Sequence, residues 1–201
     1  MIPFEILIAI IIFAFVSSIT PGPNNIMLLA SGTNYGLKKT IPHLFGIFIG
    51  FSFLLLSIGF GLSQIFDLFP ISKLILKISC GIYLTYLSYK IATATTFKND
   101  IKKKSKPLTI KQAALFQWVN PKAWIMAMSA ISVYAPNHEF STILIITVAF
   151  VLINIPCQCL WTYAGERLSY ILNNQHRLKI FNYIMAGLLM LTLLEILIIT
   201  I

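Results

Sequence analysis

The residues best suited to bind a small molecule lie in two short polar interruptions of long apolar runs. The first interruption consists of Pro21, Gly22, Pro23, Asn24 and Asn25. A proline lacks the backbone N–H that would bond the carbonyl one helical turn earlier, and its ring pushes against that carbonyl. Such a break persists in lipid only where protein or a water-filled cavity satisfies the freed carbonyl. We expect amide and backbone groups here to hold a carboxylate or an ammonium, and a purely structural kink is the alternative.

The second interruption consists of Asn120, Pro121 and Lys122, inside another apolar run. A lysine at the centre of a membrane helix costs about 2.5–3.5 kcal/mol on insertion scales, so it normally faces the bundle interior and has a partner. We therefore expect Lys122 to face a binding site. The alternatives are that its ammonium reaches a nearby surface, or that the helix begins at Pro121.

Two further amides and one acid lie in later apolar runs. Asn154 and Gln158 are four residues apart and therefore share one helix face. They predict either a polar path or an interhelical hydrogen bond worth about 0.6 kcal/mol in membranes, and both interpretations stay open. Glu195 is deep in an apolar run, which would suit a proton carrier, but it lies near the last residue and is expected at the surface.

The elements that position these residues are transmembrane helices. Of the 201 residues, 58% are hydrophobic and only 10% are charged, whereas a soluble domain has about one quarter charged residues. A bilayer core of about 30 Å needs about 20 mostly apolar residues in a helix. Six segments qualify, and together they fill one domain over residues 1–201. They are approximately 3–29, 41–64, 71–93, 112–135, 141–164 and 180–201.

The basic residues predict the orientation of these helices. Lysines and arginines concentrate in the first, third and fifth connections, at Lys38 and Lys39, in residues 98–111, and at Arg167, Arg177 and Lys179. Positive residues mark the cytoplasmic side, so these connections face inward and both termini face outward. Despite the net charge of +9, we expect lipid rather than nucleic acid as the partner, because no basic stripe is interleaved with exposed aromatic residues.

The Lys-rich loop 98–111 divides the chain into half-repeats of about 1–97 and 112–201. Three helices per half mean that the second half enters the membrane in the opposite direction. Such inverted repeats are a common transporter plan, with a site between the halves. The predicted fold is therefore an all-α integral membrane protein of six transmembrane helices, arranged as two inverted three-helix repeats with proline-broken first and fourth helices.

Several motifs in order along the chain resemble one transporter family. They are residues 20–23 (Thr-Pro-Gly-Pro), Gly46 and Gly50 at a spacing of four, residues 81–84 (Gly-Ile-Tyr-Leu) and residues 120–123 (Asn-Pro-Lys-Ala). The spacing of the two glycines also predicts a close approach to another helix. Over nearly its whole length the chain resembles the lysine exporter/homoserine-threonine resistance family. Many members carry an acid where this chain has Asn154, and a glycine where it has Ser88.

The resemblance implies a multi-pass permease of the bacterial inner membrane. Such a permease exports amino acids or related small metabolites by alternating access, is driven by the proton gradient, and works as an oligomer, with a homodimer as the expected form. The two proline breaks would frame its substrate site. Amides, backbone groups and one lysine suit a zwitterion but do not select its side chain.

Two other classes of function were weighed. A membrane thiol or redox protein needs two thiols that can meet, but Cys157 and Cys159 are two residues apart and point in different directions on a helix. A membrane hydrolase lacks support because His43, His138 and His176 lie at span ends or in loops, with no nucleophile elbow or paired-histidine zinc motif. We expect no enzyme, no cofactor and no metal.

Overall fold

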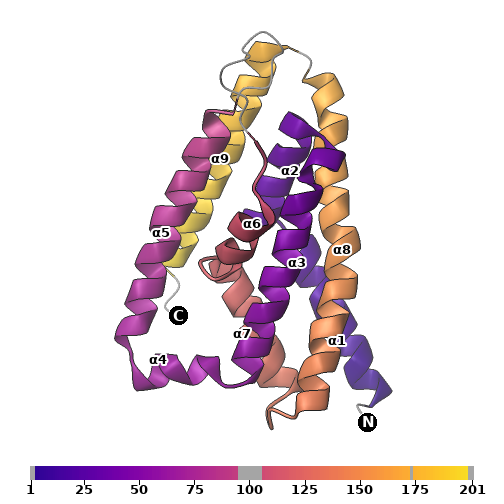
Figure 1. Cartoon of the computed structure of the whole chain (residues 1–201), viewed down its shortest axis with the longest axis vertical. Coiled ribbons are helices and arrows are strands. Elements are labelled where there is room, and N and C mark those ends of the chain that lie inside the picture. Colours follow the sequence, from indigo (N-terminus) through magenta and orange to yellow (C-terminus); the bar gives the residue numbers. More distant parts are fainter. Residues whose placement is uncertain (1–2, 95–105, 173, 199–201) are drawn as a thin grey trace.

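The computed structural model describes residues 3–94, 106–172 and 174–198, and its regular elements are all helical (Figure 1). In chain order they are α1 (Phe4–Ile19), α2 (Pro23–Tyr35), α3 (Leu37–Gly59), a 3-10 turn (Leu62–Gln64), α4 (Ile65–Leu68), α5 (Ile71–Ala92), α6 (Ile110–Gln117), α7 (Pro121–Tyr134), α8 (Phe140–Ile171) and α9 (Gln175–Ile198). The prediction of an all-helical protein is confirmed for these residues.

Several of these helices can cross a membrane. Within the described residues, α3, α5 and α8 are long and apolar enough to do so, and α1 with α2 makes a fourth candidate if the bent pair counts as one span. Large apolar side chains such as Phe53, Ile82 and Leu152 are more than half exposed on α3, α5 and α8. A surface of this kind needs lipid rather than water around it. The six-span arrangement stays a prediction.

Both predicted interruptions are helix breaks. α1 ends at Ile19, α2 begins at Pro23, and the two helices are bent by 54°. In the same way α6 ends at Gln117 and α7 begins at Pro121. A proline suits the first position of a helix, because its missing N–H would have no intrahelical partner there. Pro23 and Pro121 therefore each start a new helix instead of kinking a continuous one.

Some helix boundaries differ from the predicted ones. Lys38 and Lys39 lie in the first turn of α3 rather than in a loop, because Gly36 alone makes the sharp turn, with a φ of 81°. α8 continues to Ile171, well past the predicted end at residue 164. Polar residues near the membrane surface can still extend a helix, and hydropathy marks the apolar core rather than the helix end.

Glycines set the closest helix packing. A Cβ on Gly46 or Gly50 would lie 2.4 Å from the carbonyl oxygens of Ile110 and Ala114, so α3 and α6 approach backbone to backbone. The predicted close approach at these two glycines is confirmed, with α6 as the partner. On the other side of the bundle, a Cβ on Gly32 of α2 would lie 2.1 Å from the carbonyl oxygen of Thr162 on α8. Each broken helix is thus packed against a helix of the other half.

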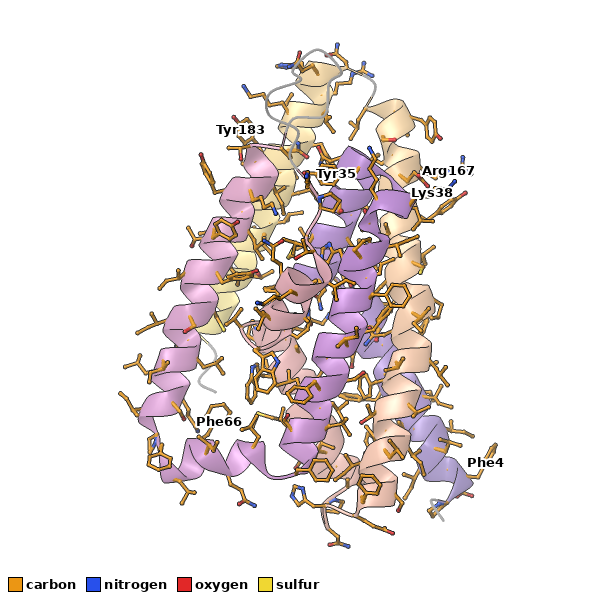
Figure 2. The ribbon with its side chains drawn as sticks, viewed as in Figure 1. Phe4, Tyr35, Lys38, Phe66, Arg167 and Tyr183 are labelled. Carbon is orange, nitrogen blue, oxygen red and sulfur yellow. The ribbon has the colours of Figure 1, made fainter. Side chains whose placement is uncertain are left out.

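The basic ends of the helices lie together. Figure 1 places the α2–α3 turn, the end of α5 and the α8–α9 connection at one end of the molecule, and α4 and the α7–α8 turn at the other. Lys38 and Arg167 both lie at the first end in Figure 2. Lys38 and Arg167, from the first and fifth predicted basic connections, thus lie at the same end (Figure 2). Residues 98–105 of the third connection lie outside the described residues, and the assignment of this end to the cytoplasm stays a prediction.

Candidate functional site

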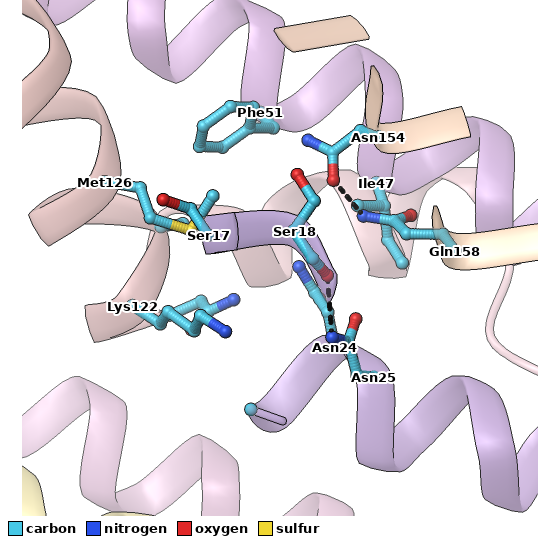
Figure 3. A pocket seen from close by; sticks show the side chains of 13 residues that line it. Ser17, Ser18, Asn24, Asn25, Ile47, Phe51, Lys122, Met126, Asn154 and Gln158 are labelled. Carbon is cyan, nitrogen blue, oxygen red and sulfur yellow. Dashed lines mark hydrogen bonds between the residues drawn. The ribbon is translucent and has the colours of Figure 1, made fainter. Parts of the chain in front are cut away.

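The two helix breaks border one polar cavity where two apolar clusters of the core meet. Ile47 belongs to one cluster and Phe51, one turn later on α3, belongs to the other. About 340 Å³ of space lies between its lining atoms, and part of that space is open to solvent. Its lining residues come from both breaks and from α3 and α8 (Figure 3): Ser17, Ser18, Gly22, Asn24, Asn25, Ile47, Phe51, Asn120, Lys122, Ala123, Met126, Asn154 and Gln158.

Lys122, near the start of α7, reaches across to the first break. Its Nζ donates to the carbonyl oxygen of Thr20 at 2.7 Å, to Thr20 Oγ1 at 2.8 Å and to the carbonyl oxygen of Pro21 at 3.2 Å. These carbonyls follow the end of α1, where the helix dipole is negative and backbone oxygens lack helical partners. The ammonium is therefore held by acceptors that only a broken helix exposes.

Gly22 makes room for the lysine. A Cβ at this position would lie 2.6 Å from Lys122 Cδ and 3.1 Å from Nζ. The backbone of Gly22 is fully extended, with φ and ψ near 180°, so the glycine is needed for space rather than for an unusual conformation. Any larger residue would displace the ammonium from the first break.

A second contact joins the breaks through two amides. Asn24 Nδ2 donates to Gln117 Oε1 at 2.9 Å, and Gln117 Nε2 donates back to Asn24 Oδ1 at 3.1 Å. Gln117 is fully buried as the last residue of α6. Sequence reasoning missed this residue, although a glutamine just before Asn120 in an apolar run was the available signal.

The remaining carbonyls of the breaks are satisfied by side-chain donors. Asn25 Nδ2 donates to the carbonyl oxygens of Ser18 and Thr20 at 2.9 and 2.7 Å. Trp161 Nε1 donates to the carbonyl oxygen of Ile19, and Trp124 Nε1 closes the second break by donating to that of Trp118. Backbone that leaves the helical pattern at membrane depth needs such partners, and the sequence analysis did not identify either tryptophan.

Asn154 and Gln158 line the wall of the cavity opposite Lys122 (Figure 3). Gln158 Nε2 donates to Asn154 Oδ1 at 3.0 Å, which confirms that the two amides share a face of α8. Both side chains are buried. Both residues belong to α8, so this contact is not the interhelical hydrogen bond that the alternative interpretation predicted.

Three buried polar atoms in the cavity have no hydrogen-bond partner among the described residues. They are Ser18 Oγ, Asn120 Oδ1 and Gln158 Oε1. A buried polar group without a partner costs about 1–3 kcal/mol. Two of the three are amide oxygens, which can only accept, while Lys122, opposite Gln158 (Figure 3), can only donate. The cavity thus has complementary places for an ammonium and for a carboxylate.

The prolines lie on a different face of the breaks. Pro21, Pro23 and Pro121 line a larger and mainly apolar cavity of about 1400 Å³ toward α9, and Gly22 and Lys122 line both cavities. The prolines therefore shape the site without facing its polar interior. The side chain of Glu195 and residues 98–105 of the Lys-rich loop lie outside the described residues.

A metal centre is not apparent at this site. In the described part of the chain no group of three or more histidine, cysteine, aspartate or glutamate residues could hold a metal ion. The three cysteines are free, with Cys80 and Cys157 buried and Cys159 partly exposed. The chemistry that the cavity offers is hydrogen bonding and charge.

Comparison with known proteins agrees with this arrangement. The family described as LysE type translocator matches residues 15–198. The chain is 28% identical over 159 residues to the cysteine/O-acetylserine efflux proteins of Escherichia coli (strain K12) and Shigella flexneri serotype 5b (strain 8401), covering 77% of this chain and 79% of each relative. No solved structure gives a significant match. The chain therefore belongs to the LysE type translocator family and is a membrane transporter rather than an enzyme.

Proposed function

We propose that this transporter exports small amino acids or related metabolites across the bacterial inner membrane, with the cavity between the two breaks as its substrate site. The observation that carries the proposal is the Lys122 ammonium, which is held across both breaks by carbonyl oxygens. The names of the relatives, which are efflux proteins for cysteine and O-acetylserine, support the substrate class.

The substrate binds by exchange of partners. Its carboxylate takes the Lys122 ammonium from the carbonyl oxygens of Thr20 and Pro21. Its α-ammonium then donates to those released carbonyls and to the unpaired Oδ1 of Asn120 and Oε1 of Gln158. The exchange leaves no charge unpaired, which matters because an uncompensated charge in a buried site is strongly destabilising.

The same exchange supplies a mechanism for alternating access. Lys122 belongs to the second half and its carbonyl partners to the first, so a bound carboxylate removes one of the contacts between the halves. The Asn24–Gln117 pair is another contact between the breaks. A ligand shifts a conformational equilibrium only when it binds the two states differently. The substrate meets that condition here, because it competes directly with the contact that holds the breaks together.

The wider architecture of the proposal follows the resemblance to the family. It comprises six spans in two inverted repeats, termini outside, a homodimer, and efflux driven by the proton gradient. Cysteine labelling of positions 102 and 137, in a background without the native cysteines, tests the orientation. We expect Lys102 to be labelled only from the cytoplasm and Asn137 only from outside. Labelling of both positions from the same side would show that no span separates them and would remove the inverted-repeat arrangement, whereas exchanged sides would refute only the orientation.

Efflux from preloaded cells tests the function itself. Cells that express the chain are loaded with a panel of dipeptides whose hydrolysis supplies individual amino acids, and with O-acetylserine, and external concentrations are followed over time. We expect faster efflux of at least one small amino acid than in vector-only cells, and its loss when an uncoupler collapses the proton gradient. If expressing cells and vector-only cells released every compound at the same rate, the proposal would be refuted. Efflux that survives the uncoupler would refute only the proton coupling.

A further inference from the structure

A second cavity, of about 400 Å³, lies at the basic end of the bundle. It is bordered by α2, α3 and α5 and by residues 106–108. His43, in the second turn of α3, lines it and is only 1% exposed. Neither ring nitrogen of His43 has a hydrogen-bond partner among the described residues. Among the described residues, the only other buried side-chain nitrogen or oxygen atoms without a hydrogen-bond partner are the three in the break cavity.

The imidazole has an unused hydrogen-bond donor whichever tautomer it adopts. At least one ring nitrogen carries a hydrogen in every protonation state. Neighbouring polar side chains do not serve it, because they bond elsewhere: Ser31 Oγ with Thr40 Oγ1 at 2.8 Å, and Asn34 Nδ2 with Asn182 Oδ1 at 2.7 Å. Buried polar groups in folded proteins normally have partners. His43 is therefore placed as a site residue would be rather than as a residue of the apolar core.

The charges around the cavity indicate the sign of its ligand. Lys90 of α5 and Lys106 of the segment before α6 both line it, and no aspartate or glutamate is among its described lining residues. Lys106 is exposed, so the cavity reaches the surface at this end. The rest of the lining is mainly apolar, with Met27, Ala30, Leu87, Ile91 and Leu108. This combination fits a small molecule with one anionic group and a short side chain.

We propose that this cavity is an entry site, in which the His43 N–H and the ammonium groups of Lys90 and Lys106 bind the carboxylate of the substrate before it reaches the break cavity. The proposal rests on the export of an amino-acid-like substrate from the basic side. The phosphate of an anionic lipid shares the chemistry of a carboxylate, so the experiment distinguishes the two.

Binding of radiolabelled cysteine to the full-length protein tests the entry site. The protein is placed in phosphatidylcholine nanodiscs under reducing conditions, and binding is measured for the wild type, Lys122→Gln, His43→Leu and the double variant. We expect Lys122→Gln to retain binding at the entry site, and the added His43→Leu to weaken that remaining binding about tenfold, as expected for the loss of one charge-assisted hydrogen bond. Lys39→Gln, which removes an exposed charge at the same end, is the matched control and should bind as the wild type does.

Thermal unfolding separates a binding role from a structural one. Replacing an unpaired buried polar group by an apolar side chain does not remove any hydrogen bond, so His43→Leu should unfold at or above the wild-type temperature. If that variant is unfolded, Lys90→Gln combined with Lys106→Gln takes its place, with the same expected loss of affinity. Either change, when added to Lys122→Gln in a folded protein, overturns the entry site if cysteine binding stays equal to that of Lys122→Gln alone.

The outcomes also identify the ligand and keep the two proposals apart. The amount of phosphatidylglycerol that stays bound during purification is measured for the same variants. If adding His43→Leu to Lys122→Gln changes only this amount and leaves cysteine binding in phosphatidylcholine unchanged, the cavity holds lipid phosphate and the proposal is wrong. If the wild type neither binds nor exports cysteine or any other compound of the efflux panel, the proposed function fails first. Export by the wild type, together with binding by the double variant that equals the binding by Lys122→Gln, refutes the entry site alone.

Discussion

Replacing Lys122 by glutamine removes the ammonium that joins the two breaks but keeps an amide donor. Glutamine is one atom shorter than lysine, so it cannot span to Thr20 and Pro21, which lie 2.7–3.2 Å from the Lys122 Nζ. Truncating one partner of a buried, hydrogen-bonded charge pair costs about 2–5 kcal/mol, and the low end applies here because Lys122 is only partly buried. If the substrate carboxylate pairs with this ammonium, a loss of about 2 kcal/mol corresponds to roughly 30-fold weaker binding.

The expected result is therefore an efflux rate at or near background from Lys122→Gln, with normal amounts of protein in the membrane. Lys122→Arg should keep partial activity at most, because its guanidinium is broader than an ammonium. There is little room beside the side chain, since even a Cβ added at Gly22 would lie only 2.6 Å from Lys122 Cδ. Efflux is normalised to the membrane protein level. Lys111→Gln is the control, because it removes an exposed charge on α6 outside the cavity.

Wild-type efflux from Lys122→Gln would contradict the proposed role. Lys122 would then only stabilise the end of α1, and the substrate site would have to be sought around Asn24, Asn25 and Asn154. Loss of protein from the membrane would instead show that the contact between the breaks is needed for folding, and binding to the detergent-purified Lys122→Arg variant would then decide the role in recognition.

Two further predictions concern the breaks and the helix crossings. Replacing Pro21 and Pro23 together by alanine should give a membrane-inserted protein without efflux, because a continuous helix withdraws the carbonyls that hold Lys122; full efflux would reduce the motif to a structural kink. Gly32→Ala should lower the unfolding temperature in detergent, because its Cβ would lie 2.1 Å from a backbone oxygen of α8, whereas Gly187→Ala, with nothing within 4 Å, should not. Equal unfolding temperatures for the two alanine variants would contradict the assigned crossing.

The sequence predicted the breaks well because proline acts locally. Pro23 and Pro121 follow Gly22 and Asn120 directly, and this combination of residues located both interruptions without a structure. Proline alone is not sufficient, because Pro42 and Pro156 lie inside α3 and α8 without ending them. The spacing of Gly46 and Gly50 likewise predicted a close helix contact. The spacing did not identify α6 as the partner, because it describes the surface of α3 and not that of the helix packed against it.

Residues whose role depends on long-range contacts were harder to predict. Gln117 pairs with Asn24, 93 positions away, and nothing local to either residue indicates the other. His43 was expected at the end of a span, and it does lie near the start of α3, but its side chain is buried beside a cavity that α2 and α5 border. Trp124 and Trp161 looked like ordinary apolar residues, because the carbonyls that their indole N–H groups satisfy become free only when the helices break.

The crossing of each broken helix with a helix of the opposite half has a consequence for biogenesis. The glycine face of α2 packs on α8, and α6 packs on the glycine face of α3. During synthesis α2 leaves the ribosome long before α8, so the first half must wait in the membrane with its small-residue face uncovered. We therefore expect neither half to persist when it is expressed alone, and the two halves to protect each other from proteolysis when they are co-expressed as separate chains.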